Sequence, residues 1–161
     1  SKDKINHSAF YDGFTVYLYM NDYSMSNKLL FTDTFTVDHF KYGTKGTASN
    51  SQGLSLLNGI NKDSYFWVSG NVPGGLYDDA TWNRVMNNFK ALAQAANELN
   101  QQGDYNFKGI FFDDESSKVA GFFPFDCEVY GAYTAGETRA TRQSKMLERG
   151  KQIMAAMLSV A

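Results

Sequence analysis

One stretch of the chain decides its fold class: residues 107–115, FKGIFFDDE, an apolar run that ends in three adjacent carboxylates. Buried strands of parallel sheets are short hydrophobic runs rich in aromatic and branched residues. Open α/β sheets and (β/α)8 barrels place their chemistry at the carboxyl ends of such strands, where Asp113, Asp114 and Glu115 fall. The stretch therefore predicts a parallel strand that presents acidic side chains at a functional edge.

Two further strands are predicted upstream, at residues 14–20, FTVYLYM, and 64–70, SYFWVSG, because both runs are β-branched and aromatic and end at turn residues. Residues 29–37 offer a weaker fourth strand, and the region through Asp38 and His39 is expected to be irregular. Residues 42–53 lack periodicity and indicate a surface loop.

Two helices are predicted after the second strand. The first is capped by Asp78 or Asp79 and closed by Gly103. Its apolar face repeats every three or four positions, at Trp82, Val85, Met86, Phe89, Leu92, Ala93, Ala96 and Leu99. The second follows a connection from Ser116 to about Arg142, and its single apolar stripe comprises Met146, Leu147, Ile153, Met154, Met157 and Leu158.

Strands that alternate with amphipathic helices predict an α/β fold with parallel pairing and right-handed crossovers. The 161 residues are enough for one domain, whereas a complete (β/α)8 barrel needs about 250. The last helix runs to Val160 and Ala161 without a capping glycine. We therefore expect the amino-terminal part of a barrel, completed by further strands absent from this sequence or by a second chain.

Composition excludes several classes of function. A net charge of −2 and a pI near 5.6, with no basic block, argue against binding to nucleic acid. No apolar run approaches the roughly 18 residues of a membrane span. Cys127 is the only cysteine and has no histidine at zinc-site spacing, and neither a phosphate loop nor a dinucleotide fingerprint occurs, so no metal or cofactor is expected. The 16% aromatic content, beside many Asn, Ser, Thr and Gly residues, fits a secreted or cell-surface protein that handles carbohydrate, or a core rich in aromatic residues.

Alternation along an extended strand places Asp113 and Glu115 on one face and Asp114 on the other. Two carboxylates on one face of a partly buried site raise one pKa, which gives one protonated acid and one ionised partner at neutral pH. Hydrolysis of a glycosidic bond uses this division of labour.

The same nine residues resemble the signature strand of chitinase-type (β/α)8 glycoside hydrolases, Phe-Asp-Gly-Ile-Asp-Ile-Asp-Trp-Glu. The resemblance implies that Glu115 is the general acid and that Asp113 orients the substrate. Lys108 and Phe111 stand where the family has its first two aspartates, and Asp114 replaces an aromatic residue. The resemblance therefore indicates a barrel glycosidase rather than a chitinase.

Substrate-binding candidates come from the ends of the other predicted strands and from the long connection: Asp114, Asp22, Asn21, Asn71, Trp67 and Tyr130. Strand ends of a barrel converge on one face, but Asn and Asp also end strands as ordinary turn residues, and Trp67 also fits a core position. Asp22 is the candidate within this chain for a second carboxylate roughly 5 to 10 Å from Glu115.

Alternatives remain open for the acidic cluster and for the connection after it. The cluster could be a solvated strand end or a helix-capping turn, or it could bind Mg²⁺ or Ca²⁺. The aromatic residues of the connection fit a sugar-stacking lid or a local cluster. A non-catalytic carbohydrate-binding or surface-assembly protein is the rival to a hydrolase that acts on carbohydrate.

Overall fold

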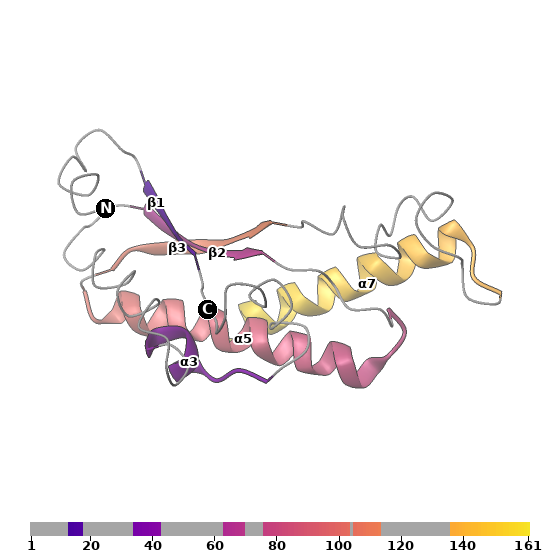
Figure 1. Ribbon diagram of the computed structural model, residues 1–161, viewed down its shortest axis with the longest axis horizontal. Coiled ribbons are helices and arrows are strands. Elements are labelled where there is room, and N and C mark those ends of the chain that lie inside the picture. Colours follow the sequence, from indigo (N-terminus) through magenta and orange to yellow (C-terminus); the bar gives the residue numbers. More distant parts are fainter. Residues whose placement is uncertain (1–12, 18–33, 43–62, 70–75, 104, 114–135) are drawn as a thin grey trace.

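The computed structural model describes residues 13–17, 34–42, 63–69, 76–103, 105–113 and 136–161. Within these ranges strands and helices alternate (Figure 1). The elements are, in chain order, β1 (Gly13–Tyr17), α3 (Val37–Tyr42), β2 (Asp63–Ser69), α5 (Asp79–Gln101), β3 (Phe107–Asp113) and α7 (Arg139–Leu158). The expected α/β class is therefore confirmed for the described part of the chain.

The three strands form one parallel sheet in the order β1-β2-β3. An irregularity in the register lies near its start: Ser64 pairs with Phe107, and the next residue, Tyr65, pairs with Gly109. Lys108 is thus an extra residue in β3, and its side chain is half exposed. Because of this bulge, Phe107 and Ile110 both pack toward the core although they are three residues apart.

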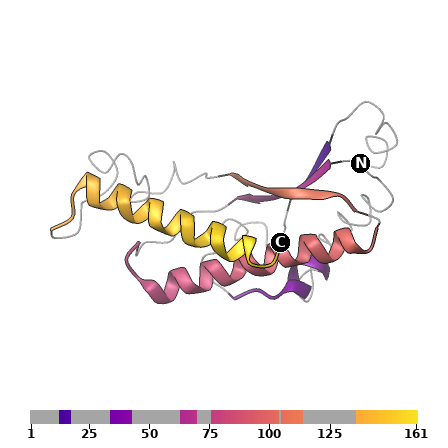
Figure 2. The same ribbon diagram turned by 180° about the vertical axis from the view of Figure 1, so that it is seen from behind.

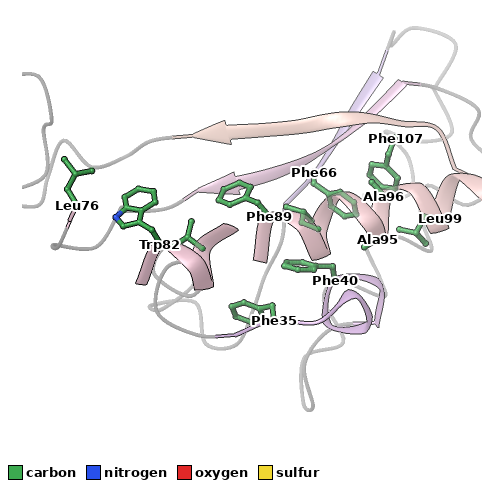
Figure 3. Packing of buried hydrophobic residues seen from close by; sticks show 12 residues of the cluster. Phe35, Phe40, Phe66, Leu76, Trp82, Phe89, Ala95, Ala96, Leu99 and Phe107 are labelled. Atoms are coloured by element: carbon green, nitrogen blue, oxygen red, sulfur yellow. The ribbon is translucent and has the colours of Figure 1, made fainter. Parts of the chain in front are cut away.

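Helix α5 covers one face of the sheet and supplies most of the core (Figure 3). Phe66 of β2 and Phe107 of β3 stack on each other with ring centroids 4.2 Å apart, and both are buried against this helix. Phe66 is fully buried, so truncation of its side chain to alanine is expected to cost about 3–5 kcal/mol. The residues of α5 that are buried are Trp82, Val85, Asn88, Phe89, Leu92, Ala95, Ala96 and Leu99.

The limits of α5 agree with the sequence prediction. Asp78 is the N-cap, and its carboxylate accepts hydrogen bonds from the backbone N–H of Ala80 (3.1 Å) and from the hydroxyl of Thr81 (2.6 Å). Gly103 follows the helix with a φ of +83°, a conformation that favours glycine. The predicted face was right in outline, but Met86 and Ala93 lie at its margins, whereas Asn88 and Ala95 are fully buried.

Helix α3 corrects two predictions. The expected irregular region at Asp38 and His39 is helical, and Val37, predicted to end a fourth strand, is the first residue of the helix. The described residues of that strand, 34–36, are not extended into the sheet, and residues 29–33 lie outside the described ranges. The helix forms because it buries Phe40 against α5, while the backbone N–H of Phe35 donates to the buried amide oxygen of Asn88 at 2.8 Å.

Helix α7 packs along α5 and corrects two further predictions (Figure 2). It begins at Arg139, before the expected end of the connection, because Thr138 and Thr141 form a reciprocal capping box. Its apolar residues form two sets rather than one stripe. One set packs against the core, and its members are Met146, Ile153 and Met157. The other is exposed, and its members are Leu147, Met154 and Leu158.

Candidate functional site

The candidate site lies where β2 and β3 end. The register pairs Ser69, the last residue of β2, with Asp113, the last residue of β3. The amino ends of α5 and α7 lie toward the same side of the molecule as the ends of these two strands (Figure 1). This edge is where α/β proteins with parallel sheets place ligands and catalytic groups.

Two of the candidate residues have a described backbone position. Asp113 closes β3, and Trp67 lies in β2 between Tyr17 of β1 and Phe111 of β3 in the register. The structure describes the backbone of Asp113 and Trp67 but not the directions of their side chains. Six candidates fall wholly outside the described residues: Glu115, Asp114, Asp22, Asn21, Asn71 and Tyr130. Their predicted convergence at this edge therefore stays a prediction.

The start of β3 is fixed by a side chain at the end of α5. The amide of Asn100 donates to the carbonyl of Phe107 at 2.8 Å and accepts from its N–H at 2.6 Å. An amide that pairs with both polar groups of one residue imitates a neighbouring strand. Asn100 thereby helps to fix where β3 begins.

A cluster of polar side chains joins the segment before α5 to the start of α7. Arg142 binds the carboxylate of Glu137 with two nitrogens, Nε to Oε1 at 2.8 Å and Nη2 to Oε2 at 2.7 Å. The Tyr77 hydroxyl donates to Oε1 of the same carboxylate at 2.9 Å. The Glu137 side chain is only 4% exposed and that of Arg142 13%, so water screens this pair weakly. We call these three residues the Tyr77 cluster.

The surroundings of Tyr77 favour its protonated form. Partial desolvation of the phenol raises the pKa of Tyr77 above its usual value, although the side chain is 48% exposed, and the hydrogen bond to Glu137 and the charge of that carboxylate raise it further. The phenol therefore stays protonated at neutral pH. It can donate a hydrogen bond and offer its ring, but it is not suited to act as a base.

A second contact joins the middle of α7 to Leu76 and to the first turn of α5, and it uses Arg149, whose side chain is 3% exposed. Its guanidinium donates to the carbonyl of Leu76 at 3.1 Å and to Asp79 at 2.5 Å, and it lies 5.5 Å from the ring centroid of Trp82. The hydrogen bond and charge of Arg149 lower the pKa of Asp79. Asp78 has a lowered pKa because it accepts from Thr81. These carboxylates at the start of α5 therefore serve the fold.

The described residues contain no group of three or more His, Cys, Asp or Glu side chains that could hold a metal ion. That search does not reach Asp114 and Glu115, so the metal alternative stays a prediction. Within the same ranges no helix has both the length and the apolar character to cross a bilayer. An open groove runs along α7, lined by Met146, Leu147, Gly150 and Met154 among others, with no carboxylate at its wall.

Sequence reasoning missed the Tyr77 cluster. Glu137 and Arg142 were placed within or at the end of a connection, and Tyr77 precedes a helix cap without any motif. The hydroxyl of Tyr77 and its acceptor are 60 residues apart in the chain, so no local spacing could pair them. The residues on either side of Glu137, Gly136 and Thr138, were a usable sequence signal for a helix start.

Searches among protein-family models, curated proteins and solved structures found no match to this chain.

Proposed function

We propose that this chain forms the amino-terminal β/α units of a barrel-type glycoside hydrolase that acts on a polysaccharide or oligosaccharide. One observation carries the proposal: the strand that leads into the acidic run is parallel to β2 and ends at Asp113, level with Ser69. Acids that follow the carboxyl end of such a strand lie where this architecture supports catalysis.

In the proposed mechanism Glu115 protonates the oxygen of the leaving sugar and later accepts a proton from water. Asp113 stabilises the positive charge that develops on the sugar ring or modulates the pKa of Glu115. Asp22 is the candidate partner carboxylate, and Asp114, Asn21, Asn71, Trp67 and Tyr130 are the candidate substrate contacts. No cofactor takes part.

The proposal includes the completion of the barrel by further strands or by a second chain, and a location at the cell surface or outside the cell, where polysaccharides occur. The exposed aliphatic side chains of α7 support a further covering element, because soluble proteins seldom leave such a row open to water. Among them Leu147 is 61% exposed and Leu158 is 65% exposed.

The test is hydrolysis of a panel of polysaccharides and chromogenic glycosides by the purified full-length protein, with its barrel complete, and by three variants of it. We expect Glu115→Gln to lower turnover by about 10²–10⁴-fold and Asp113→Asn to lower it less, because an amide cannot transfer the proton. Glu148→Gln on the exposed side of α7 is the matched control and should leave turnover unchanged. Circular dichroism and thermal unfolding check that each variant is folded.

Undiminished turnover by Glu115→Gln would contradict the proposed mechanism. Retention on a polysaccharide without turnover would instead support the second candidate, a carbohydrate-binding or surface-assembly protein. The exposed ring of Tyr77, which lies toward the side of the molecule where β2 and β3 end, favours this candidate. A protein that neither binds nor cleaves any glycan of the panel would refute both.

A further inference from the structure

Tyr77 is unusually exposed for a side chain in so constrained a position. Its side chain is 48% exposed, although Leu76 before it is buried and Asp78 after it caps α5. The backbone of Tyr77 is therefore held on both sides by the fold. Tyrosine combines an apolar ring with a polar hydroxyl, and tyrosines are enriched at contact surfaces for this reason.

The orientation of the ring is fixed from its far end. The hydroxyl of Tyr77 donates to Glu137, and this carboxylate is itself held by two nitrogens of Arg142. The ring therefore has its backbone fixed at one end and its hydroxyl fixed at the other. An aromatic surface that is ordered before a ligand arrives loses little conformational entropy when the ligand binds.

Tyr65 provides an informative contrast. It is the other described aromatic side chain that is substantially exposed, at 37%, but it lies on β2 beside Gly109. It is paired near the amino end of the sheet, far along the strand from Ser69, and no hydrogen bond of its hydroxyl fixes the ring among the described contacts. The two tyrosines thus differ in location and in how firmly their rings are held.

We propose that Tyr77 is a platform on which a pyranose ring of a bound glycan stacks, and that Glu137 is the residue that positions this ring. The proposal rests on the proposed function, because it assigns a glycan subsite to a protein inferred to act on glycans. The apolar face of a sugar ring matches an open aromatic ring. The hydrogen bond to Glu137 restricts where the Tyr77 ring lies before a ligand binds. The subsite would hold a sugar unit away from the bond that is cleaved.

The test is affinity electrophoresis in gels that contain soluble xylan, hydroxyethyl cellulose, glycol chitin or starch. Tyr77→Ala should weaken retention by about three- to tenfold, the range that aromatic contacts usually supply. Tyr77→Phe keeps the ring and should lose about twofold or less. Tyr65→Ala is the matched control and should migrate as the wild type does.

The positioning role of Glu137 needs its own measurement. Glu137→Gln removes the charge that helps to raise the pKa of Tyr77, so ultraviolet titration, with Tyr77→Phe subtracted, should show that pKa moving back toward normal. Glycan retention should weaken about twofold in the same variant while circular dichroism stays unchanged. An altered titration with unaltered retention would overturn the positioning role.

The outcomes separate this inference from the proposed function. Hydrolysis with unaltered binding by Tyr77→Ala would overturn the platform and leave the glycosidase intact. Glycan binding that Tyr77→Ala weakens by about three- to tenfold, in a protein without turnover, would support the platform and refute the glycosidase. Equal losses in Tyr77→Ala and Tyr65→Ala, or no retention of the wild type on any glycan, would overturn the platform.

Discussion

Replacement of Arg149 by methionine tests whether the contact between α5 and α7 is built as the structure indicates. Methionine keeps an unbranched apolar stem in the buried site but has no donors. The carbonyl of Leu76 would then lose its partner, a loss that costs about 1–3 kcal/mol for a buried acceptor. The contact of the guanidinium with the Trp82 ring would be lost as well, at about 0.5–2 kcal/mol.

The ion pair with Asp79 adds little to this sum, because the Asp79 side chain is 78% exposed and water can solvate the carboxylate once the arginine is gone. The variant is therefore expected to lose about 1.5–5 kcal/mol of unfolding free energy. For a chain of this length each kcal/mol corresponds to about 2–4 °C in Tm, so the midpoint should fall by roughly 3–20 °C.

The assay is urea unfolding followed by circular dichroism, with a thermal scan as the second probe. Lys90→Met, an exposed substitution of similar chemistry on α5, is the control and should stay within about 0.5 kcal/mol of the wild type. Arg149→Lys keeps the charge but cannot make the same set of contacts, and it should fall between the wild type and Arg149→Met. A loss below about 0.5 kcal/mol for Arg149→Met would refute the reasoning.

Three further predictions concern other contacts. Asn100→Leu should lower the free energy of unfolding, measured in urea, by about 2–4 kcal/mol, because the N–H and the carbonyl of Phe107 both lose the Asn100 amide as partner. An unchanged urea midpoint would contradict the role of the Asn100 amide at the start of β3. Hydrogen bonds from Lys41 and, to a smaller extent, Gln94 lower the pKa of Glu98. Ionised Glu98 therefore stabilises the fold above about pH 4.5, and this contribution is lost as the pH falls further. Lys41→Met should make the free energy of unfolding depend less steeply on pH between about pH 6 and 3. In this chain alone, without the covering element proposed above, Leu158→Ser should change the unfolding free energy by less than about 0.5 kcal/mol, and a larger loss would mean that a second copy of the chain covers this part of α7.

Features determined by local sequence were predicted well. The cap at Asp78, the stop at Gly103 and the apolar repeat between them define α5, since each depends on residues within a few positions of one another. The strand before Asp113 was also predicted, because its apolar run is short and ends abruptly. Parallel pairing followed from the alternation of strands and helices.

Features determined by distant contacts were not predicted. Helix α3 is short, and its formation depends on the burial of Phe40 and on the contact between Phe35 and Asn88 on another helix. The division of the α7 residues into a packed and an exposed set depends on where α5 lies, which periodicity does not encode. The burial of Arg149 was not predicted, because its partners Leu76 and Asp79 are about 70 residues away in the chain.

Two of the three arginines of α7 hold the same short segment. Arg142 and Arg149 are seven residues apart, which is about two helical turns and places them on one side of the helix. Arg142 reaches Tyr77 through Glu137, and Arg149 binds Leu76 directly, so both contacts end on adjacent residues. The segment that precedes α5 is thus anchored to α7 at two levels, on the side of the molecule where β2 and β3 end.

Two anchors on one segment should be energetically coupled, because release of either lets the segment move away from the other. In a cycle of Arg142→Met, Arg149→Met and the double variant, we expect the double variant to lose at least about 0.5 kcal/mol less unfolding free energy than the two single losses combined. Strict additivity would mean that the segment is held elsewhere. Coupling would support a candidate site whose surrounding helix ends are rigid before any ligand binds. Such rigidity is the condition under which the proposed aromatic platform and an acid at the end of a strand could act on the same substrate.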